Sequence, residues 1–396
     1  MNGPRDLYLQ LSSLAIFRNL LDDPVIVKLR NFISAADNTT LTVKAYAEFV
    51  SELYQSHDNF SEYLYDFMLK DENFYIKAKA TGGKIDGIIE SALENELAIL
   101  QNLSRLRPPE LKGFIKYDGF LPDWNTGEYD FAYSYREHVK NISKRGFGMY
   151  SKYHMFAVSG ENIVPVKRPD AQPLSALACY ERERALVVNN TLTLLAGGEA
   201  CNALLYGDAG TGKSSTVKAI VNEYAKEGLR LIEIKKHQLQ ALPGILGQLA
   251  ENPLKFIVFI DDLSFTENDD DFTSLKAALE GSVSARSKNV VIYATSNRRH
   301  LVKETLSDRE GDDIHLNDTL QEIMGLTARF GLTVIFERPD KETYLSIVSQ
   351  IALEYGISPD ERLLSGAEAF AVRKNGRSPR TAKQFLELQK SGSPLL

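Results

Sequence analysis

The sequence predicts an α/β fold with a parallel-sheet core, an all-helical N-terminal domain and a small C-terminal helical domain. Between residues 203 and 336, short continuous apolar runs alternate with stretches of helical periodicity, a pattern typical of parallel strands buried on both faces. Residues 1–110 keep the helical spacing of apolar side chains, and Thr42 is a candidate N-cap within them. Two further helical stretches, 341–355 and 382–388, follow the last apolar run.

The individual elements of the core are expected at defined positions. Strands are predicted at residues 203–206, 229–234, 256–260, 290–294 and 332–336. Helices are predicted at 177–195, 216–226, 238–250 and 272–280. Most of these strands are followed by a helix, as parallel pairing requires a crossover connection.

The chain of 396 residues is too long for one typical domain, so we expect roughly two or three. The predicted division is a helical domain at 1–110, an aromatic-rich connector and linker at 111–173, the α/β core at 174–338 and a helical lid at 339–396.

The connector is unusually rich in aromatic residues. They crowd between residues 114 and 156, with Lys140, Lys144 and Arg145 among them. Aromatic rings beside basic side chains can stack on single-stranded bases, but they more often fill a small satellite core. The sequence leaves both interpretations open. The stretch 163–173, with three prolines, is expected to be an extended linker.

The composition is that of an ordinary water-soluble protein, with 43% hydrophobic and 25% charged residues. A net charge of −7 argues against a surface that binds nucleic acid by charge alone, although a local basic patch remains open. Cys179 and Cys201 are the only cysteines, too few for a disulfide framework or a zinc site. No apolar run has membrane-spanning length and residues 1–21 do not resemble a signal peptide, so we expect a cytoplasmic protein without a membrane partner.

A glycine-rich stretch reading GDAGTGKSS lies between the first predicted strand and the helix that follows it. Its residues are Gly207, Asp208, Ala209, Gly210, Thr211, Gly212, Lys213, Ser214 and Ser215. The spacing G-x-x-x-x-G-K-[ST] is that of a phosphate-binding loop, the P-loop or Walker A motif. A glycine-rich surface turn is the alternative, but the flanking strand and helix favour the P-loop.

The chemistry of the motif explains its residue types. Glycines let successive backbone N–H groups point inward and cradle an anion, and the following helix directs its positive end at the same point. Lys213 then reaches the β- and γ-phosphates, and the Ser214 hydroxyl can bind Mg²⁺. The sequence therefore predicts a P-loop NTPase core that binds a nucleoside triphosphate with Mg²⁺.

Two carboxylates follow the apolar run at 256–260. Asp261 is predicted to hold Mg²⁺ beside the P-loop serine, the arrangement called Walker B. Asp262 can polarise the attacking water, although its side chain is one methylene shorter than glutamate. Asp262 could instead hydrogen-bond to the metal ligands without touching the metal. For both carboxylates, the alternative is that the strand simply ends in solvent.

An asparagine ends the next predicted strand, in the triplet Thr295-Ser296-Asn297. The Asn297 amide can both donate and accept, so it can contact the γ-phosphate or the attacking water. Asparagine also ends strands as a turn former, so the triplet alone is a weak signal.

The order of these motifs over residues 174–388, about half of the chain, resembles the AAA+ ATPases. The segments LLYGDAGTGKSS, FIDDLSF, ATSNRRHLV, ARFGL and GRSPRTAKQF more closely resemble the bacterial ATP-binding family called domain of unknown function 815. That family has no established substrate.

The resemblance implies three further roles. Asn297 would be the sensor 1 residue, Arg329 the arginine finger offered to a neighbouring subunit, and Arg380 the sensor 2 arginine of the lid. The planar guanidinium suits both arginine roles because it grips phosphate oxygens in a fixed fork. Surface ion pairing is the alternative for each arginine, and Arg377 competes with Arg380 for the sensor 2 role. Two positions depart from the family pattern. The family usually has an acidic residue in place of Ala328, and the pair at the end of the Walker B strand is Asp261-Asp262.

These observations predict an AAA+ ATPase that binds ATP and Mg²⁺, forms a homo-oligomer and couples hydrolysis to remodelling or loading of an unknown protein client. ATP is preferred over GTP on the resemblance, and ADP would be the product. Two alternatives stay open: an ATPase that handles DNA or RNA, of the helicase-loader type, and a nucleotide switch that does not hydrolyse. A P-loop kinase is less favoured, because the implied sensor and finger residues have no place in it.

Overall fold

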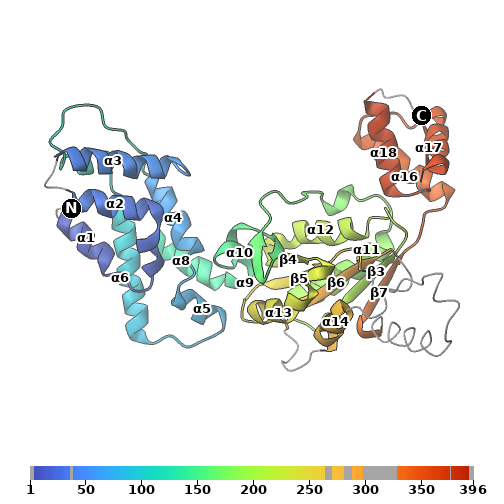
Figure 1. Cartoon of the computed structure of the whole chain (residues 1–396), viewed down its shortest axis with the longest axis horizontal. Helices are drawn as coiled ribbons and strands as arrows, with labels where there is room; N and C mark the ends of the chain where they lie inside the picture. The colour runs from blue at the N-terminus through green and yellow to red at the C-terminus, as the bar shows by residue number, and fades with distance from the viewer. Residues whose placement is uncertain are drawn as a thin grey trace. The chain divides into compact units, whose positions relative to one another are not determined.

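The computed structural model describes residues 4–35, 39–263, 270–280, 288–297, 328–374 and 376–391. The chain divides into two compact units, Met1–Lys152 and Tyr153–Leu396 (Figure 1). The finer four-part division stays a prediction. Within the part of the chain that the structure describes, no helix has the length and apolar character needed to cross a membrane.

The N-terminal unit is helical. Its α-helices are α1 (Pro4–Ser12), α2 (Pro24–Ser34), α3 (Thr39–Tyr54), α4 (Phe60–Lys70), α5 (Phe74–Ala80), α6 (Gly87–Ser104), α7 (Pro108–Lys112), α8 (Phe131–Lys140), α9 (Ile142–Arg145) and α10 (Met149–Lys152), with a 3-10 helix η1 at Arg18–Asp22.

Side-chain caps define where several of these helices begin. α2, α4, α5, α6 and α8 each follow an Asp or Asn whose side chain accepts a backbone N–H of the first turn: Asp23, Asn59, Asn73, Asp86 and Asp130. The predicted N-cap at Thr42 is wrong, because α3 already begins at Thr39. Thr42 lies buried inside the first turn, and its hydroxyl donates to the Ala35 carbonyl at 2.6 Å.

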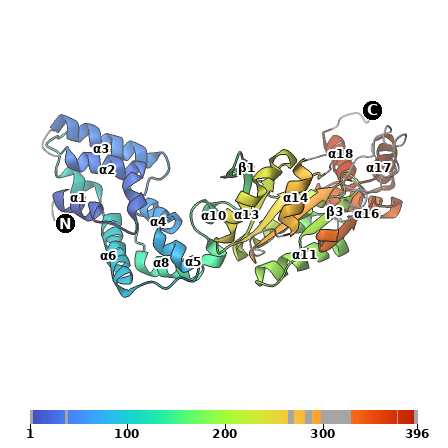
Figure 2. The same cartoon turned by 60° about the horizontal axis from the view of Figure 1, so that its bottom comes forward.

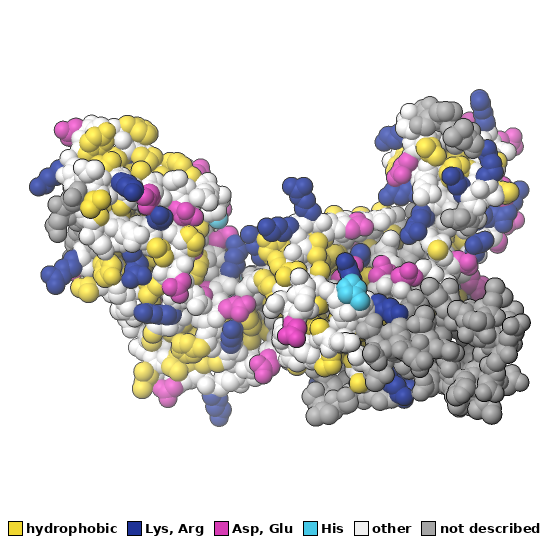
Figure 3. Space-filling model, in the orientation of Figure 1, with side chains coloured by type: hydrophobic (Ala, Val, Ile, Leu, Met, Phe, Trp, Pro, Cys, Tyr) yellow, Lys and Arg dark blue, Asp and Glu magenta, His cyan; other side chains and the backbone are white. Residues whose placement is uncertain are grey.

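Some of the connector's aromatic residues lie in the core of this unit. Trp124, Phe131 and Tyr135 are buried with the apolar faces of the helices, and the Trp124 ring lies 5.2 Å from Phe49 in an edge-on contact. Four other aromatic side chains of the connector are exposed, namely Phe114, Tyr117, Phe120 and Tyr133, and Phe120 is 87% exposed. On the face shown in Figure 3, the remaining surface of the unit mixes hydrophobic side chains with acidic and basic ones. Trp124, Phe131 and Tyr135 therefore belong to the main core of this unit and do not form a separate satellite core.

The second unit is built on a seven-stranded sheet. Its strands are β1 (Met155–Ser159), β2 (Asn162–Pro165), β3 (Ala203–Gly207), β4 (Leu229–Ile234), β5 (Lys255–Ile260), β6 (Val290–Ser296) and β7 (Leu332–Phe336), in the spatial order β2-β1-β4-β5-β6-β3-β7. All neighbours pair in parallel except β1 with β2. The five predicted strands are all present within a residue or two of their expected bounds.

Helices cover both faces of the sheet, as buried parallel strands require. α11 (Glu181–Leu195) and α12 (Lys213–Tyr224) pack on one face, while α13 (Leu242–Ala250) and α14 (Asp270–Glu280) lie on the other (Figures 1 and 2). Short 3-10 turns are η2 (Leu174–Ala176), η3 (Ala225–Glu227) and η4 (Lys236–Ala241). The fold-class prediction is confirmed.

Two details of this unit differ from prediction. Residues 155–165 form the β1–β2 hairpin at the edge of the sheet, although the linker was expected to begin at 163. The helix expected from residue 177 begins only at Glu181, because Cys179 and Tyr180 adopt left-handed backbone angles, with φ of 60° and 64°.

Three helices follow the sheet and form a lid with its own core: α16 (Lys341–Glu354), α17 (Glu361–Arg373) and α18 (Pro379–Lys390). Each is capped by an Asp or Ser, namely Asp340, Asp360 and Ser378. The sequence predicted the first and third of these helices but not α17.

Candidate nucleotide-binding site

The glycine-rich loop joins β3, which lies between β6 and the edge strand β7, to α12. Gly207 has a φ of 137°, and a Cβ there would lie 2.1 Å from the Phe336 carbonyl oxygen of β7. Gly212, with φ of 95°, forms the N-cap of α12. Both backbone angles lie where L-residues are strained, so glycine is required at the two ends of the loop. The loop thereby directs the N-terminus of α12 at the cavity that the loop lines.

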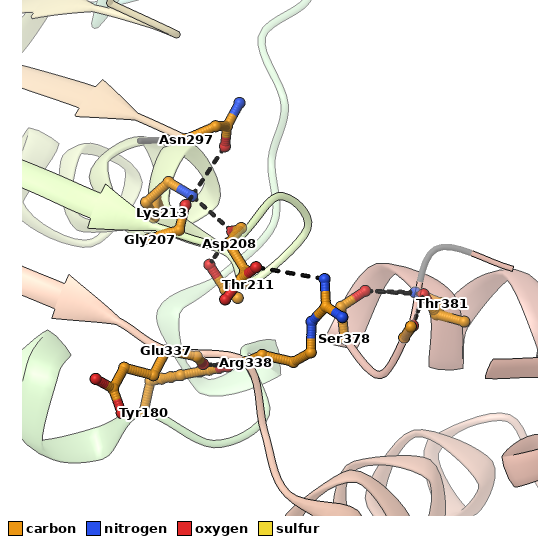
Figure 4. Close-up of polar contacts among 11 residues, drawn as sticks. Tyr180, Gly207, Asp208, Thr211, Lys213, Asn297, Glu337, Arg338, Ser378 and Thr381 are labelled. Atoms are coloured by element: carbon orange, nitrogen blue, oxygen red, sulfur yellow. Dashed lines mark hydrogen bonds and ion pairs between the residues drawn. The ribbon is translucent and has the colours of Figure 1, made fainter. Parts of the chain in front are cut away.

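Lys213 occupies the centre of this site (Figure 4). Its ammonium donates to the carbonyls of Gly207 at 2.8 Å and Asp208 at 2.7 Å, and to Oδ1 of Asn297 at 3.0 Å. Burial lowers the pKa of Lys213 to about 8, against the opposing effect of nearby carboxylates, chiefly Asp208. An incoming polyphosphate would place further negative charge against this ammonium, whose three hydrogen-bond acceptors are neutral oxygens.

Ser214 and Asp261 meet beside the lysine. The Ser214 hydroxyl donates to Oδ1 of Asp261 at 2.6 Å, and the Thr295 hydroxyl donates to the same oxygen at 2.5 Å. A hydroxyl and a carboxylate oxygen are hard ligands of the kind that Mg²⁺ prefers. This donor set fits the predicted metal ion.

Asp262 and Asn297 form a second pair at the ends of β5 and β6. The Asn297 amide donates to Oδ1 of Asp262 at 2.7 Å, while its oxygen accepts from Lys213. Asp262 has a φ of 54°, and its backbone N–H donates to the Thr295 hydroxyl at 2.9 Å. The structure thus brings the predicted catalytic carboxylate and sensor 1 residue into direct contact.

The lid reaches the same site through the first turn of α18. The Arg380 backbone N–H donates to the Gly210 carbonyl at 3.3 Å, and a Cβ on Gly210 would lie 2.9 Å from the Ser378 hydroxyl oxygen. Arg377 points elsewhere, because its guanidinium binds Glu368 of α17. This geometry favours Arg380 over Arg377 for the sensor 2 role.

These groups line a cavity of about 480 Å³. It contains the loop residues Ala209 to Thr216, both aspartates, Thr295, Asn297 and Arg380. The sequence did not single out Arg184 and Lys383, which also line it. Lys383 lies one turn beyond Arg380 on α18, a spacing that places two side chains on one helix face. Arg184 gave no comparable signal.

Arg329 is placed differently from the other predicted residues. It is half-buried, directly before β7, and is absent from the described residues that line the cavity. Ala328 beside it is exposed. The ends of the segments FIDDLSF and ATSNRRHLV, after Leu263 and Asn297, lie outside the described residues.

The strand order, the P-loop between β3 and α12, and the three-helix lid define an AAA+ type of P-loop NTPase fold. Residues 151–392 match the family model described as protein of unknown function (DUF815). That match spans more than half of the sequence, and the chain belongs to this family.

Solved structures give a weaker similarity. Two single-residue variants of RuvB from Thermotoga maritima each align with 15% identity and a TM-score of 0.37. The alignments cover 56% of this chain and 66% and 67% of the respective RuvB chains. This chain therefore spans only about two thirds of the length of those proteins.

Proposed function

We propose that this protein binds Mg-ATP and hydrolyses it to ADP, and that a homo-oligomer couples the turnover to remodelling or loading of a protein client. The observation that carries the proposal is the convergence of Lys213, the Ser214–Asp261 pair and the Asp262–Asn297 pair on one cavity. A cytoplasmic location is part of the same proposal.

Each side chain has a task in this scheme. Lys213 and the loop N–H groups bind the β- and γ-phosphates, and Arg380 approaches them from the lid. Ser214 and Asp261 would hold Mg²⁺, which when bound would neutralise phosphate charge. Asp262 accepts a proton from, or orients, the attacking water, and the Asn297 amide positions that carboxylate.

A non-hydrolysing switch is the second candidate, because one observation favours it. Asp262 is a short carboxylate and one of its oxygens already accepts from Asn297 at 2.7 Å. A carboxylate held in this way is a poor general base if ATP binding leaves the hydrogen bond intact. The two candidates make the same prediction for binding and opposite predictions for turnover.

The deciding experiment measures ATP affinity by calorimetry and turnover by phosphate release, for wild type, Lys213→Ala and Asp262→Asn. Lys213→Ala is expected to lose most of its affinity, since its ammonium binds the phosphates. Asp262→Asn is expected to bind ATP and to turn over about a hundredfold or more slowly. Equal ATP affinity in wild type and Lys213→Ala would overturn the assignment of the nucleotide site. Tight binding with equal, negligible turnover in wild type and Asp262→Asn would establish the switch.

The client is approached by the same assay. Turnover is compared with and without DNA, RNA and cell extract, alongside the mass in solution. Stimulation by nucleic acid with steep salt dependence would favour a DNA- or RNA-handling ATPase. The net charge of −7 makes a protein client the expected result.

A further inference from the structure

The P-loop carries a carboxylate at its second position, and the structure pairs it with an arginine that the scheme above does not use. Oδ1 of Asp208 lies 3.3 Å from Nη2 of Arg338 (Figure 4). Both side chains are about half exposed. The P-loop motif includes Asp208 only as a loop residue, and no motif includes Arg338.

A carboxylate on this loop opposes the ligand that the loop binds. Among the charged neighbours of Lys213, Asp208 contributes the largest effect that raises its pKa, so the carboxylate lies within electrostatic reach of the phosphate-binding ammonium. The same negative charge repels a polyphosphate. It would weaken nucleotide binding unless a cation offsets it.

The fold places Arg338 where it can offset that charge. Arg338 lies two residues beyond the end of β7, and the last carbonyl of that strand, from Phe336, accepts the Asp208 N–H at 3.2 Å. The residue between them is also held, because the Tyr180 hydroxyl donates to the Glu337 carbonyl at 2.6 Å. The backbone leading to the guanidinium is therefore anchored at two points.

On the side of the Arg338 guanidinium away from Asp208, a glycine of the lid leaves room for it. Gly376 has a φ of 92°, and a Cβ there would lie 2.7 Å from Nη1 of Arg338. Any larger residue would be strained and would crowd the arginine. Arg338 thus lies between the P-loop and the segment that leads into α18.

We propose that Arg338 is a positioning residue of the nucleotide site: it neutralises and holds Asp208, so that the P-loop presents a net positive face to the phosphates. This inference rests on the proposed nucleotide binding. Arg338 does not line the cavity itself, unlike Arg380, and acts only through Asp208.

A double-mutant cycle with ADP as the probe tests the proposal. Arg338→Ala is expected to weaken ADP binding about two- to fivefold, the range of a half-exposed ion pair, and less at high salt. Asp208→Asn should bind ADP more tightly than wild type. In the double variant the Arg338→Ala loss should disappear, because no carboxylate is left to neutralise. Arg338→Lys keeps the charge and should recover most of the affinity.

Two results would overturn the inference. One is an Arg338→Ala loss of the same size whether position 208 is Asp or Asn, which would mean that the arginine acts through the backbone of residues 336–338. The other is failure of Arg338→Lys to recover affinity. Both differ from failure of the proposed function, in which wild type and Lys213→Ala would bind ADP equally poorly.

Discussion

At the scale of single residues, the contacts of Lys213 explain its lowered pKa. Its three ammonium protons already have acceptors, two of them backbone carbonyls of its own loop. These neutral acceptors satisfy the hydrogen bonds but compensate the buried charge only in part, and the pKa falls to about 8. Bound phosphates would restore that compensation, so protonation of the lysine and nucleotide binding are linked.

A pH dependence follows from this linkage. With a pKa of about 8, Lys213 is largely protonated below about pH 7 with or without ligand, so affinity for ADP should be nearly flat there and should fall about twofold between pH 7 and pH 8. Above pH 8 most of the ligand-free lysine loses its proton. Bound phosphates would keep the lysine charged, because their effect adds to that of Asp208, Asp261 and Asp262 and outweighs that of Arg380. Affinity should therefore fall as the pH rises. Calorimetry at pH 8.5 in two buffers of different ionisation enthalpy should show uptake of about three quarters of a proton. Zero uptake would contradict the linkage.

Not every residue of the site could be predicted from the sequence. The P-loop could, because its function depends on spacing within nine consecutive residues. Neither Arg338 nor Lys383 belongs to such a motif, and their importance depends on which backbone lies opposite them in the folded chain. Arg338 had one usable signal, its position just beyond a strand end at the edge where the other site residues gather.

Glu96 is a residue-scale prediction in the N-terminal unit. This buried carboxylate on α6 accepts the backbone N–H groups of Ala15, Ile16 and Phe17 at 2.8 to 3.0 Å. Glu96→Gln places an amide donor against those donors, and should destabilise the segment by about 1–3 kcal/mol. Hydrogen exchange of the full chain should show faster exchange at residues 15–17.

The matched control is Glu94→Gln on the same helix. Glu94 is exposed and pairs with Arg136, so its loss should change stability by no more than about 1 kcal/mol. Equal exchange in both variants would show that Glu96 is not what holds the segment.

At the scale of elements, the glycine at the end of β3 sets how the P-loop leaves the sheet. Gly207→Ala would put a methyl group 2.1 Å from the Phe336 carbonyl oxygen, at a φ of 137° that alanine disfavours. Either β3 and β7 separate or the loop shifts. We expect a loss of about 1–3 kcal/mol in stability and a large loss of ATP affinity, read by thermal unfolding and calorimetry.

Gly247→Ala provides the comparison for this variant. Gly247 lies within α13 and has open space where a Cβ would stand, so alanine should be neutral or stabilise by about 0.5–1 kcal/mol. If Gly207→Ala behaves like Gly247→Ala, the close approach to Phe336 does not constrain the loop.

The elements also show where sequence patterns stop being informative. β5 was predictable because its apolar residues form an unbroken buried run. β1 and β2 are only five and four residues long, and β1 joins the sheet by pairing Phe156 with Ile232 of β4, far along the chain. No local pattern encodes that pairing.

At the scale of the whole molecule, the nucleotide site of one chain lacks one of the predicted catalytic groups. Arg329 precedes β7 and is not among the described residues lining the cavity, whereas the other predicted residues surround or adjoin it. A second subunit could supply the missing cation.

The last prediction concerns this shared site. An arginine finger contributed by a neighbour stabilises transition-state charge and is worth a factor of about 10³ to 10⁵ in turnover, with little effect on ground-state binding. Arg329→Ala should therefore bind ATP almost normally and hydrolyse it poorly, and only assemblies should be active. Turnover of mixed Arg329→Ala and Asp262→Asn subunits is the measurement, with each variant alone as the control. In the mixture, some interfaces join an intact Asp262 site to an intact neighbouring Arg329, so part of the activity should return. A mixture that co-assembles but stays inactive, or a wild type that turns over as a monomer, would show that Arg329 does not act across an interface.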